Sequence, residues 1–242
     1  MANGETVRLA VLIDADNATS GVIKELLEEV TKFGTPTIKR AYGDWTTQNL
    51  VGWKDRLHRH AVQPMQQFAY TKGKNATDSA LIIDAMDLLY AGNVDGFCIV
   101  ASDSDYTRLA TRLREAGKLV LGMGERKTPE AFIAACDRFI FVEVLKPTEA
   151  AQPPQVEGVP ELKGLLTHAV QETLRDGEWA SLAAIGSYIG KNNASFDPRN
   201  YGFKKLGELV RKQPYLEVKE THEASGLLFL QVRLRSSLGV ER

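Results

Sequence analysis

The segment RLAVLIDADN, residues 8–17, joins an unbroken apolar run to two aspartates. A run without alternation is typical of a strand that is buried on both faces of a parallel sheet. The segment GFCIVASDSDY, residues 96–106, repeats this arrangement, because its apolar run leads directly to Asp103 and Asp105. The two segments together predict a sheet with carboxylates at the ends of its strands.

Helical patterns separate the apolar runs throughout the first 145 residues. Apolar residues recur with the period of a helix over 22–33 and most clearly over 78–90. We also expect helices over 46–60, 106–115 and 129–136, and strands over 37–42, 62–68, 118–123 and 138–144. Strands that alternate with helices predict an α/β domain of the Rossmann type, with a parallel sheet and helices on both of its faces.

The chain has 242 residues, a length for which two domains are expected. Residues 146–160 hold four of the nine prolines, which is typical of an extended linker. Beyond them we expect helices over 162–174, 182–189 and 203–210, then strands over 215–219 and 227–233. Helices followed by a small hairpin predict a winged-helix domain of the α+β class. The expected division is therefore 1–146, a linker at 147–160, and 161–242.

Composition and charge are those of an ordinary globular protein. The formal net charge is −1, and from residue 160 onward there are 12 Lys and Arg against 10 Asp and Glu. No apolar run reaches the roughly 20 residues that span a bilayer, and residues 1–8 do not resemble a secretory signal. We expect a cytoplasmic protein without a membrane segment, in which Cys98 and Cys136 are buried free thiols.

The aspartates that follow the strands are the most informative feature for function. Asp14 and Asp16 follow the first apolar run, and Asp103 and Asp105 follow the later one. In a doubly wound sheet the carboxyl ends of the strands share one edge, where ligands bind. Asp78 begins the helix at 78–90 and could face the same edge. Carboxylates brought so close repel one another unless a cation neutralises them, so the pattern predicts a site for Mg²⁺ or Mn²⁺.

Simpler roles exist for some of these residues. Asp78, Ser104 and Asp105 could be helix caps and nothing more. Asp84 lies almost two turns beyond Asp78 and is expected to be a supporting or surface acid. His58 and His60 have no further Cys or His nearby, which argues against zinc. The sequence also has no phosphate-binding glycine loop of the GxxxxGK[ST] or GxGxxG kind.

The first domain resembles the NYN family of PIN-like nuclease domains, which includes the LabA-like group. The matching segments are LIDADN at 12–17, KNATD at 74–78 and ASDSDY at 101–106. The resemblance implies a metal-dependent nuclease that acts mainly on RNA. It suggests catalytic and metal-binding roles for Asp14, Asp78, Asp103 and Asp105, with Asp16, Asn17, Asp84 and Ser102 in support. Tyr106 stands where the family often has Phe.

The second domain resembles the LOTUS module, also called OST-HTH. FDPRNYGF at 196–203 carries the most specific part of this likeness. The module is associated with RNA binding and, in some proteins, with protein partners. The basic residues expected to contact RNA phosphates are Lys191, Arg199, Lys204, Lys205, Arg211 and Lys212, with Lys72 and Lys74 beside the acids of the first domain.

We therefore expect a Mg²⁺- or Mn²⁺-dependent ribonuclease that hydrolyses phosphodiester bonds in single-stranded or structured RNA. Two alternatives remain open. One is a non-catalytic RNA-binding adaptor with a vestigial acidic pocket. The other is a phosphatase of the haloacid dehalogenase type, because Asp14-Ala-Asp16 has the form of its DxD motif. Asn17-Ala-Thr19, which follows, is unlike the residues usual there.

Overall fold

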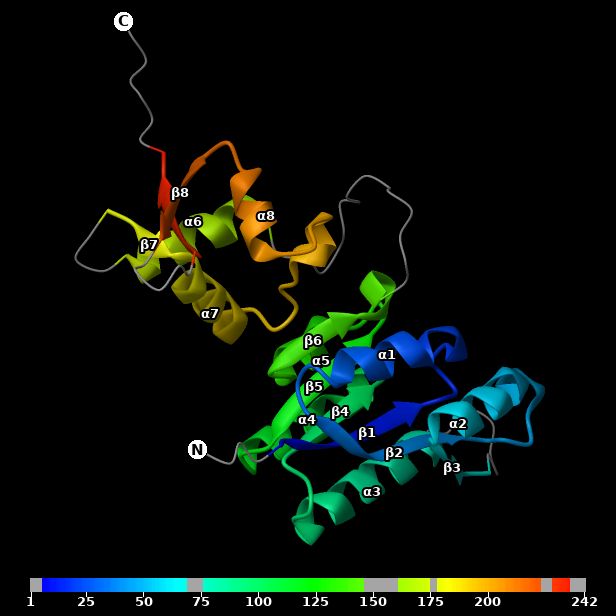
Figure 1. The fold of residues 1–242 in the computed structure, drawn as a ribbon. Coiled ribbons are helices and arrows are strands. Elements are labelled where there is room, and N and C mark those ends of the chain that lie inside the picture. Colours follow the sequence, from blue (N-terminus) through cyan, green and yellow to red (C-terminus); the bar gives the residue numbers. More distant parts are fainter. Residues whose placement is uncertain (1–5, 69–75, 146–160, 175–177, 223–227, 236–242) are drawn as a thin grey trace, which may run out of the picture. The chain divides into compact units, whose positions relative to one another are not determined.

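In the computed structural model, the described residues are 6–68, 76–145, 161–174, 178–222 and 228–235. The chain separates into two compact units, residues 1–149 and 150–242 (Figure 1). The expected linker at 147–160 lies outside the described residues. Among the helices that are described, none combines the length and the apolar character needed to cross a membrane.

The first unit is built on a six-stranded parallel sheet. Its strands are β1 (Arg8–Asp14), β2 (Thr35–Gly43), β3 (Gln63–Gln66), β4 (Gly96–Val100), β5 (Leu119–Gly124) and β6 (Arg138–Phe141). The strand order is β3-β2-β1-β4-β5-β6, and every pairing is parallel. The apolar runs of β1 and β4 are buried along almost their whole length, as their lack of alternation predicted.

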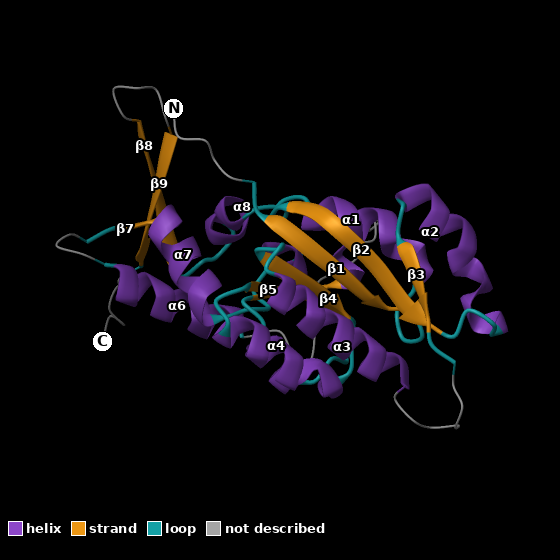
Figure 2. Ribbon diagram, turned by 90° about the horizontal axis from the view of Figure 1, so that it is seen from below, coloured by secondary structure: helices purple, strands orange, loops and turns teal. Residues whose placement is uncertain are grey.

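Helices cover both faces of this sheet, as Figure 2 shows. On one face, α1 (Ile23–Val30) and α2 (Lys54–His60) pack onto β1, β4 and β5 through a shared apolar core. On the other face lie α3 (Ala76–Ala91) and α4 (Thr107–Glu115), with α5 (Glu130–Ala135) packed beside α4. Cys98 and Cys136 are buried free thiols, which confirms their prediction. The α/β class and the parallel sheet are also confirmed.

Several expected elements of this unit are shorter than predicted, among them α1 and β3, and two of the differences have a clear local cause. Residues 46–60 begin with a 3-10 helix, Gln48–Trp53, before α2. The Asp44 carboxylate accepts hydrogen bonds from the backbone and hydroxyl of Thr46, and this local turn replaces the start of a helix. The strand expected over 138–144 ends at Phe141, because its neighbour β5 ends opposite it at Gly124.

The second unit joins three helices to a small antiparallel sheet. Its elements are α6 (Leu162–Thr173), β7 (Ala180–Ser181), α7 (Leu182–Asn192), α8 (Leu206–Arg211), β8 (Leu216–His222) and β9 (Leu228–Leu234). The sheet has the order β7-β9-β8. Leu166, Ile185, Leu209 and Val232 lie at the centre of its core and are fully buried. The prediction of a small α+β domain is confirmed.

The helix expected over 203–210 begins later, at Leu206. A 3-10 turn, Pro198–Tyr201, precedes it and ends at Gly202, whose φ of 82° lies in the left-handed region that favours glycine. The Phe203 amide donates back to the Pro198 carbonyl oxygen at 3.1 Å, so Phe203 closes the turn and lies outside the helix. The sequence does not predict β7, because two residues are too few to show a pattern.

The packing at the end of β5 generates a first prediction. A Cβ atom on Gly124 would lie 2.3 Å from the backbone oxygen of Ala101, which follows β4. We expect Gly124→Ala to lower the free energy of unfolding by about 1–3 kcal/mol, because overpacking forces the two strand ends apart. Calorimetric unfolding measures this. The control is Gly52→Ala, whose Cβ would meet nothing closer than 3.5 Å. Equal stability of the two variants would contradict the packing argument.

Candidate metal centre at the carboxyl edge of the sheet

The strand order brings the two aspartate-bearing segments together. β1 and β4 are direct neighbours in parallel register, with Ile13 opposite Val100. The chain leaves both strands at the same edge, so the loop of Asp14 lies beside the loop of Asp103. This is also where the strand order reverses, the position at which doubly wound sheets bind ligands.

Asp14 is a buried carboxylate at the last position of β1, with no exposed surface. The Asn17 side-chain amide donates to its Oδ2 atom at 2.9 Å, and the Asn17 backbone amide approaches Oδ1 at 3.4 Å. Burial raises the pKa of Asp14 to about 6, and the negative charges of Asp78 and Asp16 act in the same direction, whereas the Asn17 bonds lower it. Asp14 therefore carries an energetic cost when ionised.

Asp78 lies in the first turn of α3 and is 8% exposed. The Tyr106 hydroxyl donates to its Oδ1 atom at 2.7 Å. Burial raises the pKa of Asp78, with smaller contributions in the same direction from the charges of Asp103, Asp105 and Asp16. Asp14 and Asp78 thus lie within electrostatic reach of each other and of further acids.

The three remaining acids lie at the rim of this edge. Asp103 caps a 3-10 turn, Ser104–Tyr106, by accepting a hydrogen bond from the Asp105 backbone amide at 3.1 Å. The sequence suggested Asp105 as a cap, whereas the residue that caps is Asp103. Asp16 is exposed and accepts a hydrogen bond from the Thr77 hydroxyl at 2.7 Å, which ties the loop after β1 to the start of α3.

Asp84 is engaged elsewhere. Its Oδ1 atom accepts a hydrogen bond from Arg40 at 2.5 Å, and its Oδ2 atom accepts one from the Tyr42 hydroxyl. Both partners lie on β2, where Tyr42 is paired with Asp14 across the sheet. Asp84 fastens α3 to the sheet, and its charge is balanced by Arg40.

Oxygen donors of this kind are those that Mg²⁺ and Mn²⁺ prefer. The neighbouring acids also raise the pKa of Asp14 and Asp78, as expected of groups that a cation would stabilise. No three His, Cys, Asp or Glu side chains in the described part of the chain are grouped closely enough to hold one ion directly. The donor set therefore fits an ion that is bound by one or two carboxylates and keeps several waters, the usual coordination of Mg²⁺.

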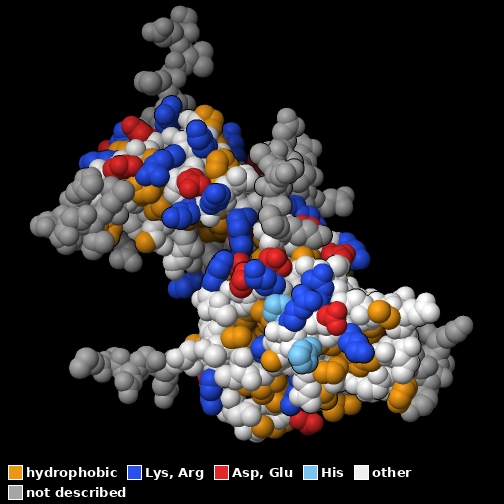
Figure 3. Space-filling model, turned by 45° about the vertical axis from the view of Figure 1, so that its right-hand side comes forward, with side chains coloured by type: hydrophobic (Ala, Val, Ile, Leu, Met, Phe, Trp, Pro, Cys, Tyr) orange, Lys and Arg blue, Asp and Glu red, His pale blue; other side chains and the backbone are white. Residues whose placement is uncertain are grey.

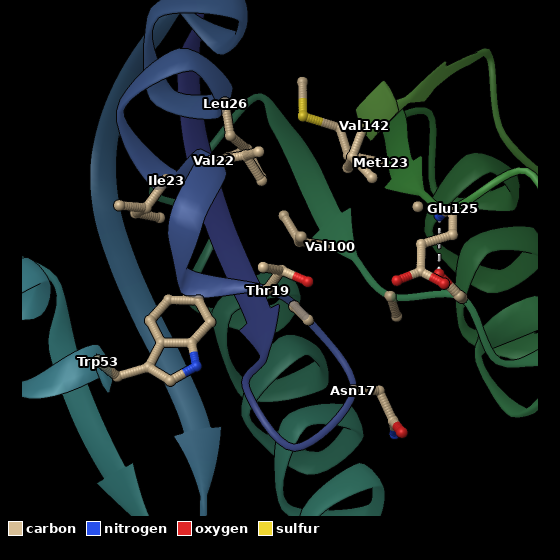
Figure 4. A pocket seen from close by; sticks show the side chains of 14 residues that line it. Asn17, Thr19, Val22, Ile23, Leu26, Trp53, Val100, Met123, Glu125 and Val142 are labelled. Atoms are coloured by element: carbon tan, nitrogen blue, oxygen red, sulfur yellow. Dashed lines mark hydrogen bonds between the residues drawn. The ribbon is translucent and has the colours of Figure 1, made fainter. Parts of the chain in front are cut away.

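Ser102 and Asn17 also line a small apolar pocket beneath α1 (Figure 4). The Ser102 hydroxyl oxygen accepts a hydrogen bond from the Glu125 backbone amide at 2.9 Å, which joins the ends of β4 and β5. Trp53 and Thr19 line the same pocket. Its volume of about 20 Å³ has room for one water molecule.

The predicted basic residues differ in their surroundings. Lys72 and Lys74 lie outside the described residues. Arg199 is paired with Asp197 at 2.6 Å and Arg211 with Glu220 at 2.5 Å. The other four are exposed and have no ion-pair partner among the residues that the structure describes: Lys191, Lys204, Lys205 and Lys212. Lys and Arg side chains gather on the face of the second unit seen in Figure 3, with Asp and Glu side chains between them.

Several polar partners of the acids were not predicted from the sequence. In the sequence, Tyr106 stands out only because it departs from a family pattern. In the structure, its hydroxyl donates a hydrogen bond to Asp78. Arg40 and Tyr42 carry no signal in the sequence, because their contacts depend on how α3 lies across the sheet. Thr77, directly before Asp78, could have been suspected from its position alone.

Comparisons with known proteins divide the chain in two. Residues 8–143 match the NYN domain, and residues 159–228 match the OST-HTH/LOTUS domain. No protein of curated function matches the chain.

Three solved structures are similar to parts of the chain. A protein of unknown function from Vibrio parahaemolyticus is 18% identical with a TM-score of 0.49, over 58% of this chain and 96% of its own. A protein from Chromobacterium violaceum is 40% identical with a TM-score of 0.29, over 36% of this chain and 91% of its own. An uncharacterized protein from Nitrosomonas europaea is 24% identical with a TM-score of 0.30, over 40% of this chain and 99% of its own.

The raised pKa of Asp14 predicts how stability depends on pH in the absence of metal. Between about pH 4 and pH 6 the native carboxyl keeps its proton while the unfolded one loses it, so stability falls as the pH rises. At pH 8 in chelator, Asp14→Asn should increase the free energy of unfolding by about 1–3 kcal/mol. Calorimetry of the full chain measures this, with exposed Asp87→Asn as the control. A less stable Asp14→Asn variant would contradict the claim that burial and the neighbouring negative charges make ionised Asp14 destabilising.

Proposed function

The chain belongs to the NYN domain family, and on that premise we propose that it is a divalent-metal-dependent ribonuclease with a C-terminal RNA-binding module. NYN domains belong to the PIN-like nuclease superfamily. The observation that carries the proposal is the meeting of buried Asp14 and Asp78 at the carboxyl edge of the sheet, where burial and neighbouring negative charge raise the pKa of both.

In the proposed mechanism, Asp14, Asp78, Asp103 and Asp105 would hold Mg²⁺ or Mn²⁺, one or two of them directly and the others through water. Bound there, the cation would polarise a phosphoryl oxygen and lower the pKa of a water that attacks the phosphodiester. The residues of the chain prepare the site. Asn17 fixes the orientation of Asp14 through two hydrogen bonds, and Thr77 holds Asp16 at the rim.

Asp84 supports the site from the β2 side. Because Arg40 and the Tyr42 hydroxyl bind both of its oxygens, Asp84 holds α3 against the sheet and adds little uncompensated negative charge. This keeps the first turn of α3, with Asp78, at the end of β1. We assign Asp84 a positioning role for that turn.

The second unit is proposed to bind the RNA backbone. Lys204 and Lys205 precede α8 and are exposed without an ion-pair partner among the described residues, so their ammonium groups are available to phosphates. Arg199 and Arg211 are weaker candidates, because contact with RNA would compete with their carboxylate partners. Tethering RNA in this way would raise its concentration at the nuclease domain.

A specific observation also favours the non-catalytic adaptor. Lys204 and Lys205 are exposed on the second unit without an ion-pair partner among the described residues, so RNA binding there requires no metal at the acids of the first unit. Such a protein would bind RNA through its second unit and would not hydrolyse it. The same experiment distinguishes the two functions.

Cleavage of single-stranded RNA in Mg²⁺ or Mn²⁺ tests the nuclease. We expect Asp14→Asn and Asp103→Asn to lower the rate at least about 100-fold, equivalent to about 2.7 kcal/mol of transition-state stabilisation. Asp87→Asn, on the exposed side of α3, is the matched control and should retain full activity. Equal cleavage by wild type and both site variants would indicate a contaminating nuclease. RNA binding without cleavage by the wild type would favour the adaptor.

RNA affinity at several salt concentrations tests the second unit. The double variant Lys204→Ala, Lys205→Ala should bind single-stranded RNA more weakly, and its salt dependence should be less steep by roughly 1–1.5 units of slope. The control removes equal charge by Lys163→Ala and Lys219→Ala, whose ammonium groups lie over the rings of Tyr215 and Trp179. If the control has the same effect or a larger one, the assignment of Lys204 and Lys205 is wrong.

A further inference from the structure

We propose that the Tyr106 hydroxyl is a positioning group that holds the Asp78 carboxylate, beside Asp14, ready for a divalent cation. The inference deepens the proposed function and rests on it. It concerns a residue that contributes no ligand atom of its own and acts only through the Asp78 carboxylate.

The hydroxyl contacts one of the two most deeply buried acids of the site and lies near the other. Tyr106 has no exposed surface, and its hydroxyl donates to Oδ1 of Asp78 at 2.7 Å. Burial raises the pKa of this hydroxyl, and the negative charge of the nearby Asp14 carboxylate acts in the same direction. Because Asp14 ends β1 and Asp78 lies in the first turn of α3, the hydroxyl lies where two separate elements meet.

The position of the hydroxyl is fixed by the rest of its residue. The Tyr106 ring packs on Phe132 with 6.2 Å between ring centroids, and Phe132 packs on Phe139 at 5.8 Å. The Tyr106 backbone ends the turn that Asp103 caps. The ring cannot rotate away from the acids without disturbing this aromatic stack, so the donor is held in place before any ligand arrives.

The same turn connects Tyr106 to the rim acids. Asp103 caps the turn and Asp105 lies within it, directly before Tyr106. One tyrosine thereby couples two acid-bearing segments, the first turn of α3 and the turn after β4. A phenylalanine would preserve the ring packing and remove this link alone.

The consequence for cation binding follows from the repulsion between the acids. Without the donor, Asp78 would be free to rotate away from Asp14, and the cation would have to bring both carboxylates back together. Groups that hydrogen-bond to metal-ligating side chains typically contribute about 10- to 100-fold to metal affinity. We expect an effect in this range from a single hydroxyl.

The test is Mn²⁺ affinity, measured by isothermal titration calorimetry on the full chain without RNA. Tyr106→Phe should bind Mn²⁺ at least about tenfold more weakly than wild type, with its near-ultraviolet circular dichroism unchanged. The matched control is Tyr90→Phe, at the other end of α3, where the tyrosine side chain is 73% exposed. The control should bind Mn²⁺ as the wild type does.

Each outcome decides between the two proposals. Equal or tighter Mn²⁺ binding by folded Tyr106→Phe would overturn the positioning role and leave the ribonuclease proposal standing. Mn²⁺ binding that weakens in Tyr106→Phe, in a protein that cleaves no RNA, would support the positioning role and overturn the nuclease. Wild-type protein that binds no Mn²⁺ would overturn both.

Discussion

The electrostatic repulsion between the buried carboxylates of Asp14 and Asp78 is the constraint on which the site depends. Neither side chain can move into solvent, because β1 holds one and the first turn of α3 holds the other. Burial and mutual repulsion raise their cost of ionisation, and the rim acids add to it. A fold that keeps such an arrangement is more stable when a cation or a proton is present.

Neutral donors organise the acids of the carboxyl edge without cancelling their charge. Asn17 orients Asp14, Tyr106 contacts Asp78, and Thr77 holds Asp16. The only described cation with a short contact to an acid of α3 is Arg40, and it is paired with Asp84, away from the carboxyl edge. The carboxyl edge therefore keeps its negative charge, which a site for a hard divalent cation requires.

The sequence predicts the parts of this arrangement that depend on strand ends. Unbroken apolar runs before Asp14 and Asp103 are enough to predict a parallel sheet whose strand ends share one edge, whereas the adjacency of β1 and β4 comes from the fold. The sequence does not predict contacts that depend on the rotation of a helix, and the pairing of Asp84 with Arg40 and Tyr42 is the clearest case. The late start of α8 could not be predicted, because the conformation of Gly202 and the Phe203 hydrogen bond override a helical pattern.

The central claim is that the acids of the carboxyl edge share one cation. Anomalous diffraction from a crystal soaked in Mn²⁺ tests it most directly, because the signal identifies the metal and its neighbours without any assay of activity. We predict a strong peak between Asp14 and Asp78, with Asp103 or Asp105 within reach through water. The claim would be contradicted if the acids of the carboxyl edge are well ordered and bind no metal at saturating Mn²⁺. A metal peak found only elsewhere on the chain would contradict it as well.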